Sequence, residues 1–444
     1  MTIYALSTGS GLSGLAVVRV SGSDCKAVIE LMIEGNMPKP RMATLKKIKK
    51  VNTKEVIDEG IVIWFPGPQS YTGEDLLEFH VHGGRAIVKA LMDSLSIIQN
   101  CRMAEPGEFT KIAFQNKKIN LLQAEGIGDL ISSETEIQRR QAIDVMSGYQ
   151  GKKYERWRKK LLKALSNIEA KIDFPDEDLP KEILSDIKTI TKDVKNEITK
   201  VLEDQKVGER IREGFKISIL GPTNAGKSSL LNYLSRREVA IVSEIAGTTR
   251  DVIETYLNLD GYPVILSDTA GIREAKDDIE RRGIKLALKK SENADLNIVV
   301  IEPKSVHFTG VLKSLINSDS TVLVLNKSDL VSTKDLENFK NLNPIIISIK
   351  EEKNLDKLIS EIRNRLKNKF MSTADTIITR ERHRQHLIQC INYLGSFENK
   401  NDTKDFDKAA EDLRLATRQL GMIVGNIDVE EVLGSIFNDF CIGK

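Results

Sequence analysis

The sequence predicts a multidomain protein of the α/β and α classes, with an N-terminal α+β domain and a helical domain that an α/β domain interrupts. Three observations support this organisation. A glycine-rich loop at residues 221–228 lies between an apolar run and a helix-like segment. Strand-like segments dominate residues 1–116, and amphipathic helical patterns lie on both sides of the glycine-rich region. The length of 444 residues is sufficient for two to four domains.

Residues 1–116 combine strand and helix patterns. We expect strands at 3–7, 15–20, 60–65 and 76–81, and helices at 23–33 and 85–98. In Leu77-Glu78-Phe79-His80-Val81-His82, apolar and polar side chains alternate strictly. Two histidines at this spacing suit a metal site, but no third ligand is evident. A polar strand face is therefore the favoured interpretation.

From residue 117 the pattern becomes helical. Apolar residues recur at helical spacing over 161–172 and again over 183–201, and Pro175 separates the two stripes. These helices need apolar partners, which the chain supplies at 379–394, 409–420 and 429–440, the last with a capping box at Asp428 and Glu431. We therefore expect a helical domain in two halves, 117–213 and 372–444, around an insert at 214–371.

The glycine-rich loop at the start of this insert is Gly221-Pro222-Thr223-Asn224-Ala225-Gly226-Lys227-Ser228. A loop of this type between a strand and a helix is typical of a phosphate-binding P-loop, with a chance glycine turn as the alternative. Its backbone N–H groups and the helix dipole attract phosphate oxygens. Lys227 would add a positive charge at the phosphates, and Ser228 a hydroxyl ligand for Mg²⁺.

Three motifs downstream complete a guanine-nucleotide pattern. Asp268-Thr269-Ala270-Gly271 ends a strand. It supplies the aspartate expected beside the Mg²⁺ ion and the glycine expected at the γ-phosphate. In Asn326-Lys327-Ser328-Asp329, the Asp329 carboxylate can accept hydrogen bonds from guanine N1–H and its 2-amino group, which adenine cannot match. Ser348-Ile349-Lys350 occupies the place of a base-contacting turn. The order of the four motifs predicts an inserted Ras-like P-loop GTPase domain.

The segment between the P-loop and the Asp268 motif has the features of a switch. Asp260-Gly261 predicts a hairpin between strands at 251–259 and 262–267, and Thr249 is the expected switch ligand of Mg²⁺. Ile272 stands where Ras-type switches carry a water-orienting glutamine. Either hydrolysis is negligible or another residue and another positive charge replace that function, with Arg250 as one candidate for the charge. The residues expected to contact GTP are Asn224, Ala225, Gly226, Lys227, Ser228, Ser229, Ser243, Glu244, Ile245, Ala246, Gly247, Thr248, Thr249, Asp268, Thr269, Ala270, Gly271, Asn326, Lys327, Asp329, Ser348, Ile349 and Lys350.

Composition limits the remaining options. Lys and Arg total 66 and Asp and Glu 64, so the net charge of +2 provides no global field that recruits nucleic acid. Four cysteines without a C-x-x-C pair argue against zinc and against a disulfide scaffold. The chain opens directly into a strand-like segment, and no apolar run reaches transmembrane length. We therefore expect no signal peptide, no membrane span and a cytoplasmic location.

Further sequence blocks add to the four motifs: Tyr71-Thr72-Gly73-Glu74-Asp75, Ala104-Glu105-Pro106-Gly107-Glu108-Phe109-Thr110, Leu121-Leu122-Gln123-Ala124-Glu125, Asp173-Phe174-Pro175-Asp176-Glu177, Ile245-Ala246-Gly247-Thr248-Thr249-Arg250-Asp251 and the terminal Phe440-Cys441-Ile442-Gly443-Lys444. Together with the motif order, they make the chain resemble the MnmE/TrmE family of tRNA-modification GTPases over essentially its whole length. It departs from the family pattern in two places: the glycine-rich turn at 8–14 lacks a proline, and Thr223 stands where proline is common.

The resemblance implies a GTPase domain that dimerises through its switches around a potassium ion, which replaces an arginine finger. The implied catalytic residues include Lys227 and Thr249, and Glu280 as the acid that orients water. On the residues alone, Glu280 would be a solvated acid at a helix N-terminus. The implied potassium ligands are at Asn224, Ser243, Ile245 and Thr248.

The resemblance also implies an N-terminal domain that dimerises and binds 5-formyl-tetrahydrofolate or a related folate as one-carbon donor. The implied folate contacts are Arg19, Glu78, Lys118 and Lys444. Cys441 has two interpretations, a catalytic thiol or buried packing beside an aromatic residue, and packing is favoured.

The implied partners are a second copy of this chain, tRNA and a protein of MnmG/GidA type that carries FAD, with which the homodimer forms a heterotetramer. The implied reaction adds a carboxymethylaminomethyl-type group to carbon 5 of the wobble uridine. The basic stretches 152–160 and 380–384 are candidate contacts for tRNA phosphates, and a solvated charged face is the alternative. A different class of function stays open, a GTP-regulated binding module such as a ribosome-assembly factor.

Overall fold

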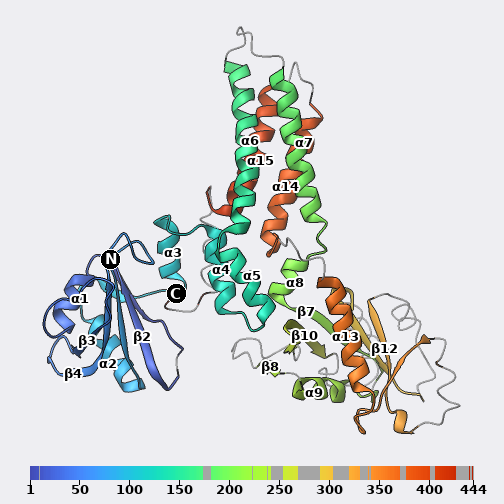
Figure 1. Cartoon of the computed structure of the whole chain (residues 1–444), viewed down its shortest axis with the longest axis horizontal. Coiled ribbons are helices and arrows are strands. Elements are labelled where there is room, and N and C mark those ends of the chain that lie inside the picture. The colour runs from blue at the N-terminus through green and yellow to red at the C-terminus, as the bar shows by residue number, and fades with distance from the viewer. Residues whose placement is uncertain are drawn as a thin grey trace, which may run out of the picture. The chain divides into compact units, whose positions relative to one another are not determined.

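The computed structural model describes residues 1–9, 11–173, 182–222, 224–237, 239–241, 254–268, 291–303, 320–330, 339, 342–370, 377–400, 406–426, 440 and 443. The chain forms two compact units. The first comprises residues 1–128, 144–191 and 392–444, and the second comprises residues 129–143 and 192–391. Figure 1 shows both units, with the helices and several of the strands labelled.

The N-terminal domain of the first unit is built on a six-stranded sheet in the order β3-β4-β5-β2-β1-β6. Its strands are β1 (Thr2–Leu6), β2 (Ser13–Ser21), β3 (Thr44–Lys49), β4 (Val56–Phe65), β5 (Leu76–Gly83) and β6 (Cys101–Met103). Neighbouring strands are antiparallel except β1 and β6, which are parallel. The four predicted strands are confirmed. The lysine-rich β3 and the three-residue β6 were not predicted because neither shows an apolar alternation.

The two faces of this sheet differ in what covers them. Helices α1 (Cys25–Met32) and α2 (Arg85–Ser96) share one apolar core with the sheet, into which Phe79 and Val81 point. The opposite face carries the polar side chains of β5, as the strict alternation predicts. A third helix, α3 (Glu108–Gln115), contributes Phe109 to a small separate core with Ile3 of β1.

Long amphipathic helices form the helical domain. They are α4 (Leu121–Ile131), α5 (Glu136–Met146), α6 (Tyr149–Asp173), α7 (Glu182–Leu202), α14 (Glu381–Glu398) and α15 (Phe406–Val424). Helices α6 and α15 lie side by side, so segments from before and after the insert share a core, as predicted (Figure 1). The fully buried rings of Tyr154 and Trp157 on α6 meet edge to face, 5.8 Å apart. The helix expected at 429–440 lies outside the described residues, except Phe440.

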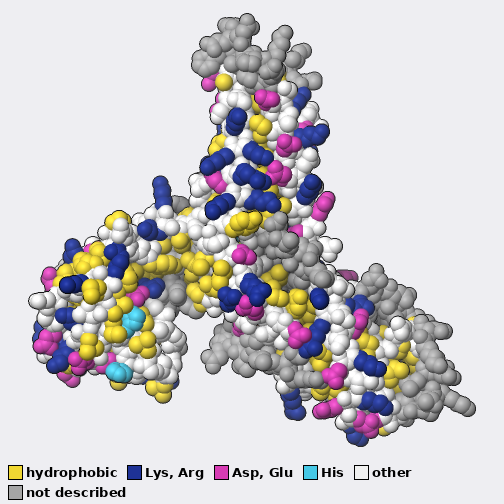
Figure 2. Space-filling model, in the orientation of Figure 1, with side chains coloured by type: hydrophobic (Ala, Val, Ile, Leu, Met, Phe, Trp, Pro, Cys, Tyr) yellow, Lys and Arg dark blue, Asp and Glu magenta, His cyan; other side chains and the backbone are white. Residues whose placement is uncertain are grey.

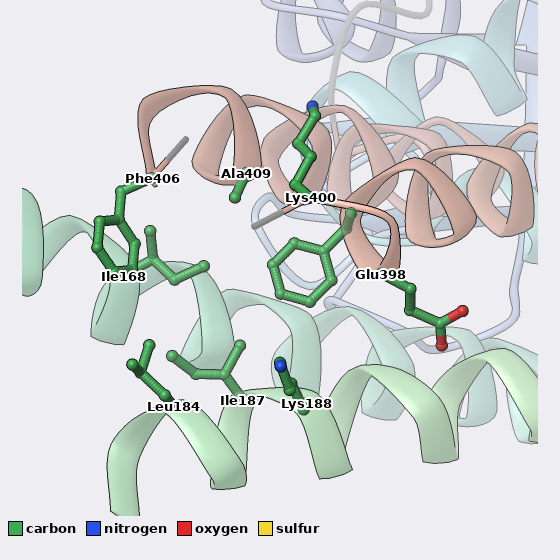
Figure 3. A pocket seen from close by; sticks show the side chains of 9 residues that line it. Ile168, Leu184, Ile187, Lys188, Glu398, Lys400, Phe406 and Ala409 are labelled. Carbon is green, nitrogen blue, oxygen red and sulfur yellow. The ribbon is translucent and has the colours of Figure 1, made fainter. Parts of the chain in front are cut away.

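An apolar hollow lies among these helices in the first unit (Figure 3). Ile168 of α6, Ile187 of α7 and Phe397 of α14 line it, together with Phe406 at the start of α15. Lys188 and Glu398 add charged groups at its border. The hollow shows where the four helices converge.

Among the described helices of the chain, none is long and apolar enough to cross a membrane.

The second unit contains the Ras-like P-loop GTPase domain. Its seven-stranded sheet has the order β13-β12-β11-β7-β10-β9-β8. Its elements are α8 (Val207–Glu213), β7 (Phe215–Leu220), α9 (Lys227–Arg237), β8 (Val239–Ile241), β9 (Glu254–Leu259), β10 (Tyr262–Asp268), β11 (Leu296–Ile301), β12 (Thr321–Leu325), the 3₁₀ turn η1 (Ser328–Leu330), β13 (Ile345–Ile346) and α13 (Leu355–Phe370). Strands β13, β12, β11, β7 and β10 run parallel, and the β9–β10 pair is antiparallel. The predicted hairpin turn is confirmed, since Asp260 and Gly261 both have positive φ, as a type I′ turn requires.

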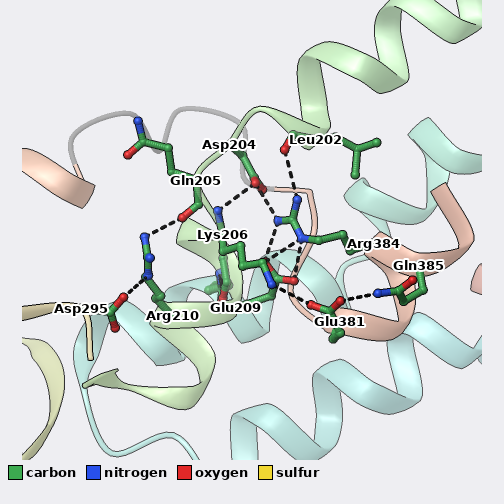
Figure 4. A network of polar contacts seen from close by, with 12 residues as sticks. Leu202, Asp204, Gln205, Lys206, Glu209, Arg210, Asp295, Glu381, Arg384 and Gln385 are labelled. Carbon is green, nitrogen blue, oxygen red and sulfur yellow. Dashed lines mark hydrogen bonds and ion pairs between the residues drawn. The ribbon is translucent and has the colours of Figure 1, made fainter. Parts of the chain in front are cut away.

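Helix α8 joins the helical region to this sheet. Val207 and Ile211 on one side of α8 are part of the GTPase core. On its other side, Glu209 forms a buried ion pair with Arg384 of α14 (Figure 4). Arg380 donates a hydrogen bond to Asp129 at 2.7 Å. The arginines at 380 and 384 therefore serve the packing of this unit, and this basic stretch is a poor candidate for contact with tRNA.

Candidate functional site: a nucleotide site and an N-terminal polar site

The P-loop leaves β7 and enters α9 with three residues in the left-handed backbone region. They are Gly221, Asn224 and Gly226, with φ of +145°, +63° and +99°. A Cβ on Gly221 would lie 2.0 Å from the carbonyl oxygen of Val300, and one on Gly226 would lie 2.3 Å from Nδ2 of Asn326. Only glycine fits either position, so the loop can turn closely against β11 and the Asn326 motif.

The cationic end of the loop lies at the start of α9. Lys227 is the first residue of this helix, and its ammonium donates a hydrogen bond to the carbonyl oxygen of Pro222 at 2.8 Å. Ser228 and Ser229 follow in the first helical turn, where backbone N–H groups point out of the helix. A lysine, two hydroxyls and a helix N-terminus at one loop fit the phosphates of a nucleotide and a Mg²⁺ ion.

Asn326 connects the P-loop to the predicted base-contacting turn. It is 3% exposed, and its Nδ2 donates to the carbonyl oxygen of Ala225 at 2.9 Å. Its Oδ1 accepts from the backbone N–H of Ile349 at 3.3 Å. One buried amide therefore joins three motifs that are far apart in the sequence.

Asp329 is held in position to read a base. Its Oδ1 accepts a hydrogen bond from the Ser348 hydroxyl at 2.6 Å. This bond, with the positive charges of Lys350 and Lys327, holds the pKa of Asp329 below its usual value. The carboxylate is therefore ionised at neutral pH and accepts hydrogen bonds only, which suits the two donors on guanine.

One contact at this end of the site was not predicted from the sequence. The Lys327 ammonium lies 2.5 Å from a carboxylate oxygen of Glu302, which follows the end of β11. The signal was available, since ligand groups of parallel sheets gather at the carboxyl ends of the strands. Glu302 fixes the direction of the lysine in the Asn326-Lys327-Ser328-Asp329 motif.

Part of the predicted site lies outside the described residues. This applies to Ser243, Glu244, Ile245, Ala246, Gly247, Thr248, Thr249, Arg250, Thr269, Ala270, Gly271, Ile272 and Glu280, and to the side chain of Asp268. The backbone of Asp268 ends β10, which pairs in parallel with β7 so that Asp268 lies opposite Ile219. The strand before the P-loop and the strand before the Mg²⁺ motif therefore end side by side. Of the predicted potassium ligands, only Asn224 is described, and it is exposed at the loop surface.

Comparison with known proteins matches the whole length of the chain. The family model for the N-terminus of the GTP-binding protein TrmE covers residues 2–118, and the model for the MnmE helical domain covers residues 121–441. The chain belongs to the MnmE family. It is 66% identical over 445 residues to the tRNA modification GTPase MnmE of Pelagibacter ubique, and 44% identical over 452 residues to that of Rickettsia bellii. Each alignment covers 100% of this chain and 100% of the relative.

A solved structure of Aquifex aeolicus Era bound to GDP and aluminium fluoride is 28% identical, with a TM-score of 0.26. That match covers 34% of this chain and 56% of the Era chain.

The resemblance to MnmE/TrmE is confirmed, and the chain is a GTP hydrolase of this family.

Two of the folate contacts expected of an MnmE protein, Arg19 and Glu78, lie together on the face of the N-terminal sheet opposite α1 and α2. They are register partners on β2 and β5, and their side chains form an ion pair at 2.9 Å. The Arg19 guanidinium also lies 5.5 Å from the centre of the Tyr71 ring and 5.7 Å from that of Phe109. A charge pair between two aromatic rings offers both stacking and hydrogen-bonding groups to a flat heterocycle.

Tyr71 and Phe109 received no role from the sequence, although both belong to the blocks that carry the family resemblance. Burial raises the pKa of Tyr71, although the Thr110 hydrogen bond and the charge of Arg19 act in the opposite direction. The phenol therefore stays neutral and bonds Thr110 at 2.8 Å. Lys118 does not join the Arg19 pair, because its ammonium donates to the Pro68 carbonyl oxygen at 2.9 Å.

The end of the chain lies against the N-terminal domain. The Ser7 hydroxyl donates to the carbonyl oxygen of Gly443 at 3.0 Å, and a Cβ on Gly443 would lie 2.3 Å from the Leu6 carbonyl oxygen. Phe440 is 9% exposed and packs in a cluster with Leu121 of α4. Cys441 and Lys444 lie outside the described residues, but the residues beside them connect the terminus to β1 and α4.

The two histidines of β5 have carboxylate neighbours. His80 Nε2 lies 3.2 Å from Glu78 Oε2, and His82 Nδ1 lies 3.0 Å from Asp58 Oδ1. Within the described part of the chain, no group of three or more His, Cys, Asp or Glu side chains is arranged to hold a metal ion.

Proposed function

We propose that this protein hydrolyses GTP to drive the addition of a carboxymethylaminomethyl-type group to carbon 5 of the wobble uridine of certain tRNAs. The observation that carries the proposal is the connection of the P-loop, Asn326 and the Asp329–Ser348 pair, in a chain that belongs to the MnmE family. The FAD is supplied by a partner protein of MnmG/GidA type, and the reaction takes place in the cytoplasm. Within this proposal, the division into 1–116, 117–213, 214–371 and 372–444 describes the domains.

In the proposed nucleotide site, Ser228 and Thr249 bind Mg²⁺, and Asp268 lies on the Mg²⁺ side. Lys227 neutralises phosphate charge, and Glu280 orients the attacking water. A potassium ion held by Asn224 and by the positions 243, 245 and 248 supplies the positive charge that Ras-type enzymes receive from an arginine. The exposed position of Asn224 at the loop surface is compatible with an ion shared between two GTPase faces.

The proposed N-terminal function is to bind 5-formyl-tetrahydrofolate or a related one-carbon donor. The pair Arg19–Glu78 and the rings of Tyr71 and Phe109 support it. The placement of Gly443 beside β1 supports a role for the neighbouring Lys444, and Lys118 would have to leave the Pro68 carbonyl oxygen to take part.

The proposed homodimer has support on the same sheet. Leu45 of β3 and Ile61 of β4 are register partners, and they are 63% and 41% exposed. Leu15 of β2 is 52% exposed. Exposed apolar side chains on a sheet face favour a protein partner, and a second copy of the chain is the proposed one.

Mass spectrometry of wobble nucleosides tests the reaction. Cells that lack this protein should lose the modified uridine, and the wild-type chain should restore it. A Lys227→Ala chain should not restore it, because the P-loop would lack its phosphate-neutralising charge. If the nucleosides of the deletion cells are unchanged, the GTP-regulated binding module, for example in ribosome assembly, becomes the better hypothesis.

A further inference from the structure

Helix α6 carries a row of basic side chains on its solvent face, which we call the α6 stripe. It consists of Lys152, Arg156, Lys159 and Lys163, all exposed. Their spacings of four, three and four residues place them on one face of the helix. At about 1.5 Å per residue the stripe is roughly 16 Å long. Figure 2 shows Lys and Arg side chains gathered on the helical bundle where Figure 1 places α6.

One acidic side chain of α6, Glu155, borders this stripe, since it lies three residues after Lys152 and four before Lys159, but other partners engage its carboxylate. Glu155 is the one acid in the first 20 residues of α6, and it lies beside Arg158 at 3.1 Å and Asn426 at 3.3 Å. The next acid, Glu169, forms an ion pair with Arg414 of α15 at 3.0 Å. The positive charge of the α6 stripe is therefore concentrated, although the whole chain has a net charge of only +2.

The neighbouring helix α7 serves as a comparison, because its solvent-exposed side chains carry charges of both signs. On α7, exposed Lys192 and Lys200 alternate with the acids Asp186, Asp193 and Glu197. Mixed signs of this kind cancel at a distance, whereas the α6 stripe has a single sign over about three helical turns.

We propose that the α6 stripe binds the sugar–phosphate backbone of RNA. Cations about 5–6 Å apart along a helix suit a row of phosphates, and they carry no information about base sequence. Tyr149 lies at the start of the same helix and is 65% exposed, which offers an aromatic surface for an unpaired base. The inference rests on the proposed function, because the RNA would be the tRNA that is modified.

The opposite side of α6 makes the proposal testable without loss of the fold. Tyr154, Trp157 and Leu161 are fully buried and hold the helix in its core. Substitutions on the α6 stripe therefore leave the packing of α6 intact. The test variant of the full chain is K152E/K159E/K163E, measured by fluorescence anisotropy with unmodified tRNA over a range of salt concentrations.

The matched control carries the same change of charge elsewhere, as K192E/K200E/K357E on α7 and α13. We expect the test variant to bind tRNA at least tenfold more weakly than the control at about 100 mM salt. The slope of log K against log salt should become shallower by about two to three, since each lost phosphate contact removes about 0.7–0.9. GTP hydrolysis should be equal in both variants.

Equal affinity and equal salt slope in the two variants would overturn the inference, as would failure of the wild-type chain to bind tRNA. Loss of wobble modification in K152E/K159E/K163E with unchanged tRNA binding would also overturn it and assign the stripe to a protein partner. If the test variant loses tRNA binding while even the wild-type chain modifies no uridine, the RNA surface stands and the proposed reaction fails.

Discussion

Removing the cation from the buried pair between α14 and α8 should destabilise the second unit strongly. Arg384 is 6% exposed, and its guanidinium donates to the Glu209 carboxylate at 2.9 and 2.6 Å (Figure 4). It also donates to Asp204 at 2.7 Å and to the Leu202 carbonyl oxygen at 3.1 Å. Burial disfavours the charged guanidinium, but the bonds with Glu209 and Asp204 outweigh it and raise the pKa of Arg384.

The size of the effect follows from what the substitution leaves behind. Arg384→Met keeps much of the aliphatic stem, but it leaves Glu209, which is 5% exposed, buried without its cation. Breaking a buried pair from one side costs about 3–5 kcal/mol. The double variant Arg384→Met with Glu209→Leu removes both charges of this pair and leaves only Asp204, whose side chain is partly exposed, without its cation, so it should recover part of that loss.

Amide hydrogen exchange of the full chain measures this locally. The two tryptophans, Trp64 and Trp157, belong to the first unit and would not report on α8. We expect Arg384→Met to lower the opening free energy of the α8 and α14 amides by about 3–5 kcal/mol. Arg139→Met is the control: its partner Glu136 is 48% exposed, so solvent can replace the lost cation and exchange should stay close to that of the wild-type chain.

Two results would refute this reasoning. The first is equal exchange in Arg384→Met and Arg139→Met, which would mean that burial of an ion pair does not increase the loss of stability when its cation is removed. The second is a double variant as unstable as Arg384→Met, which would mean that packing and not the unpaired carboxylate causes the loss.

Three further predictions concern ligands. Asp329→Asn should shift the nucleotide preference from GTP toward XTP, because the new amide can donate to the 2-oxo group; retained GTP preference in a competition assay would contradict the base-reading role. Arg19→Ala should weaken the binding of 5-formyl-tetrahydrofolate in calorimetry, and equal affinity would leave the N-terminal domain as a dimerisation module. GTP hydrolysis should be faster in potassium than in sodium and rise with protein concentration, and Glu280→Ala should lose turnover while keeping GTP binding. Equal rates in the two salts would contradict the potassium mechanism and favour Arg250 as the source of the positive charge.

The sequence was sufficient wherever a few consecutive residues specify both backbone and chemistry. The P-loop is such a case: its glycines, Lys227 and Ser228 are adjacent, and the positive φ of Gly221 and Gly226 follows from their lack of a side chain. The strict alternation in β5 likewise predicted which side chains face the helices. Helical periodicity predicted that α6 and α7 need partners from beyond the GTPase domain.

Periodicity and charge did not show which partner each side chain would find. Arg384 belongs to a basic run that resembles a solvated or RNA-binding face, yet it is buried against Glu209, an acid 175 positions away in the chain. Tyr71, Phe109 and Arg19 come from separate elements and meet only because the sheet and α3 bring them together. Contacts of this kind depend on how elements pack, which local residue patterns do not encode. The sequence by itself determined the nucleotide motifs and the need for a shared helical core, whereas the tertiary structure alone decided which charges are buried in pairs and which remain on the surface.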